Sequence, residues 1–454
     1  MISRSLFVAA FLLAASAASG AAETNRVTSA TNWLTRALSL DDCMDLALKQ
    51  NSAILKGKSD LEAAYGVVVQ TRAIAIPKLR ATGDYSATDA TEKFPGADFT
   101  INRDQNWSAN VRVVQSIYEG GRIRSALRTA QLTQEQAILE YERVIADSLL
   151  DVRVTYYDVL LTTQQVLVQE ASVNLLAKEL EDTRHRFDAG TVSRFNVLRA
   201  EVELANARPR LIRAKNAYRI AKNTLANLLG YNLPRDLWEN VPLTLTGKLA
   251  AEPYEIDLPA AIGQALEWRP ELGVLRKAEG LRKEGVTSAQ GGYKPSVQLF
   301  AGYGARNSQF SDDLVREISG WQAGAQVSWD IFDGRLTKGK VDQARALHEK
   351  SKHELDDTTR RIELEVRTAY SQFIEAKELL ESQKKVQEQA EEALRLANAR
   401  ADTGTGTQLD VLSAQTALTD ARSTQIQALR DYAVARARLE RAIGQTVIRE
   451  NAIP

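Results

Sequence analysis

The chain has 454 residues, of which 44% are hydrophobic and 26% charged, and its 58 basic residues balance its 58 acidic ones. This length suits two or three ordinary domains or one elongated domain. With zero formal net charge and no run of like charge, nothing in the sequence indicates nucleic-acid binding or a polyionic partner. The function must therefore be inferred from the order of the residues.

The first 22 residues have the pattern of a secretory signal peptide. Arg4 precedes a short apolar run, Leu6 to Ala15, and small residues follow it. The run is too short to span a membrane as a helix. We predict that residues 1–22 are removed on export and that residues 23–37 form an N-terminal extension. No later apolar run approaches 18 residues, so no transmembrane helix is expected.

The rest of the chain is predicted to be a tandem repeat. The phrases RFDAGTVSRFNVLRAE (186–201) and RADTGTGTQLDVLSAQ (400–415) share seven residue types in register, 214 positions apart. Gly190 and Gly404 within them are expected at tight turns between helices, where φ is positive. The predicted parts are a first repeat at 38–230, a proline-containing linker at 231–255, a second repeat at 256–444 and a C-terminal tail at 445–454.

Each repeat is predicted to begin with a helix that ends at a proline. The helical patterns cover about 41–73 and 259–291, and Pro77 and Pro295 follow them. Proline lacks a backbone N–H and its ring clashes with a continuing helix. These two residues are therefore expected to mark the helix-to-strand transitions.

Two strands are predicted after each proline, because the apolar period changes there from 3.6 to 2. The alternating runs cover 79–88, 107–117, 296–306 and 321–331. Each has about ten residues, the length that a tilted strand needs to cross a bilayer. Aromatic residues near the strand ends are expected to form membrane-surface girdles: Tyr85, Trp107, Tyr303, Trp321 and Trp329. A soluble sheet with one buried face would show the same alternation.

Four strands cannot close a barrel, and open sheet edges are not tolerated in lipid. The smallest usual membrane barrel has about eight strands, so several copies of the chain must share one barrel. Two copies would supply eight strands and a filled interior, whereas three would supply twelve and a wider lumen. The residues alone leave both numbers open.

A long helix and a shorter one are predicted to complete each repeat. The long patterns follow Gly120 and Gly334 and cover 121–187 and 335–401, about 67 residues each, which is about 100 Å at 1.5 Å per residue. Their apolar residues largely follow a seven-residue spacing, which packs helices side by side at shallow angles. The shorter helices are expected at about 193–230 and 407–444. The strands and the twin phrases would then lie at opposite ends of a rod.

Few residues suggest catalysis or metal binding. The three histidines are not paired, and no CxxC, HExxH or GxSxG motif occurs. The GTGT stretch at 404–407 has neither a preceding strand nor a following Gly-Lys pair, so a nucleotide site is rejected. We expect no cofactor, no metal and no enzymatic activity.

The duplicated unit, its two prolines and the twin phrases together resemble the TolC family of outer membrane efflux proteins. This resemblance implies a mainly α fold, in which long antiparallel coiled-coil-like helices form a periplasmic α-barrel. It also implies a homotrimer with a shared twelve-stranded β-barrel in the lipid of the outer membrane of a Gram-negative bacterium. Residues 23–37 would be periplasmic, and the 231–255 linker would be equatorial.

The resemblance further implies a function as an exit duct for small molecules or proteins. Its partners would be a periplasmic membrane-fusion adaptor and an inner-membrane pump of the RND or ABC type. The alternative interpretation is a soluble periplasmic coiled-coil scaffold or binding module, whose strands form a soluble cap.

The twin phrases are, by the same resemblance, the adaptor-docking turns and the narrow periplasmic aperture. The docking residues would be Asp188, Ala189, Gly190, Thr191, Asp402, Thr403, Gly404 and Thr405. The family's aperture aspartate corresponds to Asp410, and three such carboxylates around an axis would favour cations. Its next acidic position is Ser413 here, and Asn196 is the first-phrase equivalent of Asp410. A tyrosine and an arginine that close the aperture in the best-known member are replaced by Ala401 and Gly406, so closure must use other groups or be looser.

Overall fold

The computed structural model describes residues 36–87, 91–93, 100–102, 105–231, 241–307 and 317–445. The predicted signal peptide, nearly all of the N-terminal extension, part of the linker and all but one residue of the C-terminal tail lie outside the described residues. None of the described helices is both long enough and apolar enough to cross a membrane.

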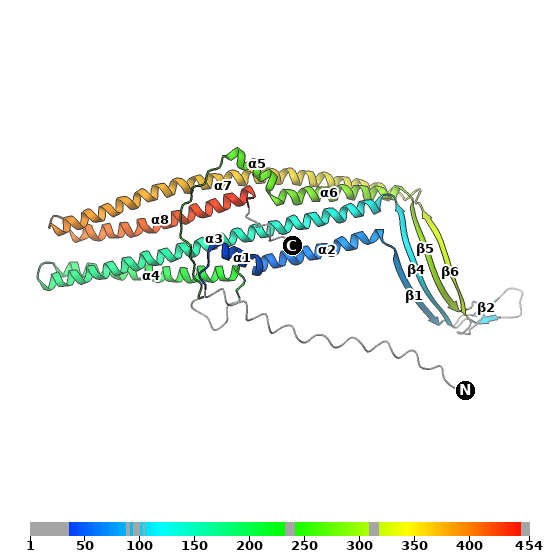
Figure 1. Ribbon diagram of the computed structural model, residues 1–454, viewed down its shortest axis with the longest axis horizontal. Helices are drawn as coiled ribbons and strands as arrows, with labels where there is room; N and C mark the ends of the chain where they lie inside the picture. Colours follow the sequence, from blue (N-terminus) through cyan, green and yellow to red (C-terminus); the bar gives the residue numbers. More distant parts are fainter. Residues whose placement is uncertain are drawn as a thin grey trace, which may run out of the picture.

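Both halves of the chain fold into the predicted order of helix, strand and helix (Figure 1). The first half contains α1 (Leu40–Gln50), α2 (Ser52–Arg72), the 3₁₀ turn η1 (Ala73–Ala75), β1 (Lys78–Ala87), β2 (Thr91–Lys93), β3 (Thr100–Asn102), β4 (Gln105–Glu119), α3 (Arg122–Asp188) and α4 (Arg194–Leu228). The second half contains α5 (Leu258–Trp268), α6 (Pro270–Gln290), the 3₁₀ turn η2 (Gly291–Tyr293), β5 (Ser296–Asn307), β6 (Glu317–Ser328), α7 (Leu336–Asp402) and α8 (Gln408–Ile443). The long helices α3 and α7 have 67 residues each, as predicted.

The long helices α3 and α7 run through the helical region, and the shorter helices lie beside them. Near the strands the packing order is α2-α3-α6-α7, and toward the far end it is α4-α3-α8-α7. The antiparallel sheet has the order β1-β4-β5-β6. Figure 1 shows this sheet at one end of the molecule and the α3–α4 and α7–α8 turns at the other. One side edge therefore consists of β1, α2 and α4, and the other of β6 and α7.

The prediction of one continuous first helix in each repeat is wrong. The first pair breaks at Asn51, whose side-chain oxygen accepts hydrogen bonds from the N–H groups of Ala53 (2.8 Å) and Ile54 (3.2 Å). Its amide nitrogen also donates to the carbonyl of Leu228 at the end of α4 (2.7 Å). The second pair breaks before Pro270, at the first position of α6. Asparagine favours the N-cap, and proline the first helical position, so both begin a new helix.

The strand boundaries also differ from those predicted. β6 begins at Glu317 and ends at Ser328. The predicted strand, 321–331, therefore began and ended too late in the sequence. β4 continues to Glu119, with a register shift between Ser116 and Tyr118. Such a bulge inserts an extra residue and breaks the alternation, so the two-residue period misplaced this end of the strand. The three-residue strands β2 and β3, which pair with each other, were not predicted.

The largest buried clusters lie midway along the rod. In the first, Cys43 of α1 and Val152 of α3 pack with Leu225 of α4. The linker contributes to it, because Leu38 pairs with Leu245 in an isolated parallel bridge and donates its N–H to the carbonyl of Thr244 (2.9 Å). The second cluster joins α5, α6, α7 and α8. These clusters fix the short helices against the long ones.

Candidate functional site

Both twin phrases form tight turns at the end of the molecule that lies away from the sheet. Gly190 and Gly404 have φ values of 76° and 73°, which side-chain-bearing residues rarely adopt. An added Cβ at either glycine would meet no atom within 4 Å. The glycines are therefore required by the backbone conformation, and the space around them is open to a partner.

The first turn is closed by backbone hydrogen bonds to the last residues of α3. Ala189 donates to the carbonyl of His185 (3.0 Å), and Gly190 donates to that of Phe187 (2.8 Å). Thr191 donates to the carbonyl of Arg186 from both its N–H (2.9 Å) and its hydroxyl (2.8 Å). Asp188, the last residue of α3, is exposed.

The second turn is likewise closed by backbone hydrogen bonds to the last residues of α7. Thr403 donates its N–H to the carbonyl of Ala399 (3.2 Å), and the N–H groups of Thr405 (3.0 Å) and Gly406 (2.9 Å) both donate to that of Arg400. A Cβ at Gly406 would lie only 2.8 Å from the Cβ of Arg400. Asp402 is the last residue of α7, which ends beside this turn.

Asp410 has a structural role that sequence reasoning missed. Its Oδ2 accepts hydrogen bonds from the N–H (3.0 Å) and the hydroxyl (2.8 Å) of Thr407, the N-cap of α8. Thr407 in turn accepts from the Asp410 N–H (3.3 Å), which completes a capping box. The backbone bond from Thr407, followed by the hydroxyl bond, lowers the pKa of Asp410, so its carboxylate is charged at neutral pH. The Thr–Gln–Leu–Asp order was a signal for this box.

Of the other two predicted aperture residues, Ser413 lies beside Asp410, and Asn196 lies near the start of α4, after the other turn. Asn196 is on α4, which packs mainly against α3, and its N-cap residue Ser193 makes no side-chain cap. Ser413 lies one turn after Asp410 and donates its hydroxyl to the Asp410 carbonyl (2.9 Å). Gln408, which we did not predict, joins α8 to α3 by donating to Thr183 Oγ1 (3.0 Å). Among the described residues, no hydrogen bond joins Asn196 to Asp410.

The sheet has one apolar face and one polar face. In the register, Ala81 lies opposite Val111, Val111 opposite Tyr303, and Tyr303 opposite Trp321. The exposed large apolar residues of this face are Leu79, Tyr85, Val111, Val113, Leu299, Tyr303, Trp321 and Val327. Such an extended apolar surface indicates contact with lipid or protein.

The predicted girdle residues form two cross-strand pairs and one separate contact. Tyr85 lies opposite Trp107 in the first hairpin, and Tyr303 lies opposite Trp321 in the second. Trp321 is 80% exposed. Trp329 lies after the end of β6, where its Nε1 donates to the carbonyl of Tyr293 (3.2 Å).

The two predicted transition prolines lie directly before strands. Pro77 follows η1 and precedes β1, and Pro295 follows η2 and precedes β5. Both positions connect the helical region to the sheet.

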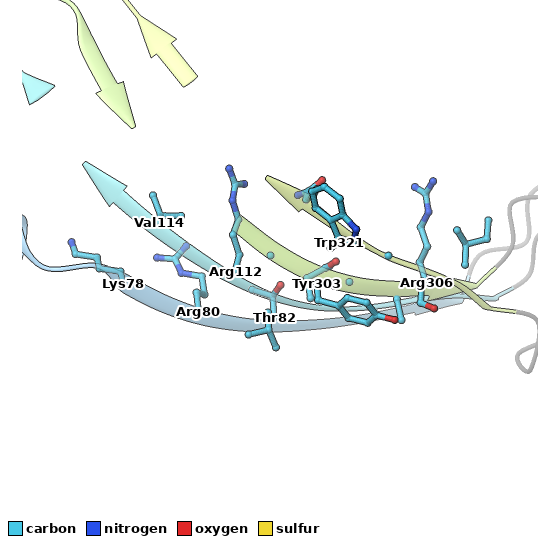
Figure 2. A pocket seen from close by; sticks show the side chains of 17 residues that line it. Lys78, Arg80, Thr82, Arg112, Val114, Tyr303, Arg306 and Trp321 are labelled. Carbon is cyan, nitrogen blue, oxygen red and sulfur yellow. The ribbon is translucent and has the colours of Figure 1, made fainter. Parts of the chain in front are cut away.

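The polar face of the sheet borders a hollow of about 930 Å³. Its lining includes the basic residues Lys78, Arg80, Arg112 and Arg306, and Figure 2 shows the three guanidinium groups on one side of the sheet. We did not predict this group, although its members occupy polar positions of the alternating runs. Across the described parts of the chain, no three His, Cys, Asp or Glu residues are placed to hold a metal ion.

Comparison with known proteins supports the fold and the repeat. Residues 43–231 and 261–445 match the family model described as outer membrane efflux protein. The outer membrane protein TolC of Escherichia coli K12 is 22% identical over 425 residues, which cover 90% of this chain and 83% of TolC. The alkaline protease secretion protein AprF of Pseudomonas aeruginosa is 24% identical over 416 residues, covering 89% of this chain and 84% of AprF.

The solved structure of the Campylobacter jejuni CmeC outer membrane channel is also similar. Its TM-score is 0.77 at 17% identity, and the match covers 89% of this chain and 85% of CmeC. The arrangement of long helices and a four-stranded sheet is therefore that of a known channel fold.

Proposed function

Because this chain belongs to the outer membrane efflux protein family, we propose that three copies form one continuous duct through the outer membrane and the periplasm. The protein is an outer membrane channel for export in a Gram-negative bacterium. In the proposed trimer, the sheets form a twelve-stranded barrel and the helices a periplasmic α-barrel. The duct is passive and catalyses no reaction.

The observation that carries this proposal is the sheet with two open edges and an exposed apolar face. Lipid tolerates neither unpaired edge, so β1 of one copy must pair with β6 of the next. The contact is head-to-tail and closes into a ring. Three sheets supply enough strands for an open lumen, whereas two would supply a barrel filled by side chains.

The helical edges support the same ring. On α4, Val202 and Ile212 are 56% and 65% exposed, and on the opposite edge Leu364 and Val386 of α7 are 63% and 42% exposed. In the proposed trimer, α4 of one copy packs against α7 of its neighbour, which would remove these side chains from water.

We assign adaptor docking to the two turns and the aperture to Asp410, with Asn196 and Ser413 nearby. The aromatic pairs and Trp329 would mark the membrane surfaces. The remaining partners are the outer membrane lipid and an inner-membrane pump of the RND or ABC type. A soluble scaffold is not favoured, because it would expose the apolar face of the sheet to water.

The trimer is tested by native mass spectrometry of the detergent-extracted protein, together with conductance in planar bilayers. We expect a mass of three chains and stable single-channel currents. A soluble mature protein would contradict the channel, and a mass of two chains would contradict the trimer.

The edge contact has its own test. The double variant Val202→Glu/Ile212→Glu should reduce the trimer fraction, because it buries six carboxylates at the proposed contacts. Ala417→Glu places a carboxylate at an exposed site of α8, which packs between α3 and α7 and is not at a side edge, and it should leave the trimer intact. An equal loss of the trimer fraction in the double variant and in the control would contradict the proposed contact between α4 and α7.

A further inference from the structure

The polar face of the sheet has a marked excess of positive charge. Lys78 and Arg80 of β1, Arg112 of β4 and Arg306 of β5 border the hollow. Two acidic residues lie on this face in the paired strands. Asp84 accepts a hydrogen bond from Ser108 Oγ (3.0 Å), and Glu119 lies opposite Ser296 at the end of the sheet nearer the helices. Within the described residues, none of the four basic side chains forms an ion pair. Among the described residues, no carboxylate therefore neutralises these four charges by an ion pair.

Two of these charges face each other directly. Arg80 and Arg112 are opposite in the β1–β4 register, on the same side of the sheet. Like charges at directly opposed positions destabilise a pair of strands. An anion held between the two guanidinium groups would remove this repulsion and accept their fork-shaped hydrogen bonds.

Arg112 is also held in a defined position. Its guanidinium carbon lies 4.1 Å from the centre of the Phe300 ring. A Cβ at position 324 would lie 2.9 Å from Cζ of Phe300, so Gly324 provides room for the ring. Phe300 is an aromatic residue on a polar face, and its stacking with Arg112 explains this position. Stacking on aromatic rings is a property of arginine that lysine shares only in part.

We propose that this face forms an anion-binding ring in the exit lumen, suited to cargo with two or more carboxylate or phosphate charges. The inference rests on the proposed trimer, in which apolar faces contact lipid and polar faces line the lumen. Each of the three chains then contributes four basic side chains. Rings of arginine and lysine are a known means of anion selection in pores. The ring lies at the opposite end of the duct from Asp410.

The test measures block of single-channel current in planar bilayers by inorganic pyrophosphate, added to one side at a time. Wild type should be blocked more strongly from the side nearer the strands. Arg80→Gln/Arg112→Gln should raise the half-blocking concentration by about tenfold or more. Arg306→Gln should raise the half-blocking concentration less, because Arg306 is on β5 and does not belong to the directly opposed pair. Arg80→Lys/Arg112→Lys retains the charges and should keep most of the block.

Two controls separate this ring from other charges of the duct. Lys384→Gln/Lys385→Gln removes the same charge from exposed positions on α7 and should leave the block unchanged. Asp410→Asn changes a charge at the far end of the duct, so block by pyrophosphate added on the side nearer the strands should be unchanged. If Arg80→Gln/Arg112→Gln conducts and is blocked like wild type, the anion ring is overturned and the channel stands. If wild type forms no conducting channel, both proposals fail.

Discussion

Arg441, near the end of α8, donates from Nη2 to Oε1 of Glu271 at the beginning of α6, over 2.6 Å. The same guanidinium donates to Asp147 of α3 (2.6 Å), and Arg269 donates to Glu365 of α7 (2.6 Å) as well as to Glu271. The Arg441 side chain is only 8% exposed. Four helices from both repeats therefore meet in one ionic network, where α5 gives way to α6.

Glu271→Gln should destabilise the protein at neutral pH. Burial raises the pKa of Glu271, but hydrogen bonds from Arg269 and the charge of Arg441 outweigh it, so the pKa falls from 4.5 to about 2. A lowered folded-state pKa means that the stabilisation is present above about 4.5 and is lost as the pH falls toward 2. We expect the variant to lose about 2–3 kcal/mol at pH 7.

The measurement is the unfolding midpoint of the detergent-extracted protein by circular dichroism, at one protein concentration and at several pH values. The midpoints of wild type and Glu271→Gln should converge between pH 4.5 and 2. Glu392→Gln is the matched control, because its ion pair with Arg395 is exposed to solvent and should contribute little. A constant difference between wild type and Glu271→Gln over the whole pH range would show that packing, not charge, is lost.

Gly120→Ala should be far more harmful than Gly334→Ala, although the repeat makes these positions equivalent. Their φ values are 62° and 65°, so both substitutions carry the same backbone strain of about 1–2 kcal/mol. A Cβ at Gly120 would lie 2.4 Å from the carbonyl oxygen of Gly291, whereas one at Gly334 would meet nothing within 4 Å. The difference between the two unfolding midpoints measures the clash. Equal midpoints would mean that β4 and η2 can move apart freely.

Gly190→Val and Gly404→Val should impair adaptor docking while trimers still form. A β-branched residue at positive φ must distort the turn, and neither turn lies in a buried cluster. Docking is measured by photo-crosslinking from Ala189→Cys labelled with a photoreactive maleimide, since the native Cys43 is buried. Gly285→Val, at an open helical position, is the control. Undiminished crosslinking in both turn variants would place docking elsewhere.

The periodic parts of the fold were accessible from the sequence, and its tertiary contacts were not. The two long helices and the turns at Gly190 and Gly404 follow from local periodicity and backbone preference. The break at Asn51 depends in part on a bond to Leu228, 177 residues away. At Pro270 the signal was present, since proline favours a helix start.

The candidate sites divide in the same way. The positions of the turns at Gly190 and Gly404, where we propose that an adaptor docks, were predictable, because one helix must end and another begin at each glycine. The basic group was also visible, since Arg80 and Arg112 occupy polar positions of alternating runs. Their direct opposition required the strand register, and the stacking on Phe300 required side-chain positions. The Glu271 network, which joins residues from both repeats, had no local signal.

Asp410 has two roles, as a capping residue of α8 and as the proposed aperture charge, and three variants separate them. Asp410→Asn keeps an acceptor for the Thr407 N–H but removes the charge, so the cation-to-anion permeability ratio should fall by roughly threefold. Thr407→Ala removes the capping hydroxyl but keeps the carboxylate, so selectivity should persist while the second turn becomes less stable. Asn196→Asp adds a carboxylate to the first turn and should raise the ratio.

The ratio is obtained from reversal potentials in a potassium chloride gradient. Hydrogen exchange of the amides at the start of α8 reports the state of the cap independently. If Thr407→Ala lowers the cation preference as much as Asp410→Asn does, Asp410 acts by shaping the turn. If only Asp410→Asn lowers it, the carboxylate itself selects ions. In that case the two ends of the duct carry opposite charge, and acidic cargo is disfavoured at the periplasmic turns and attracted at the strands.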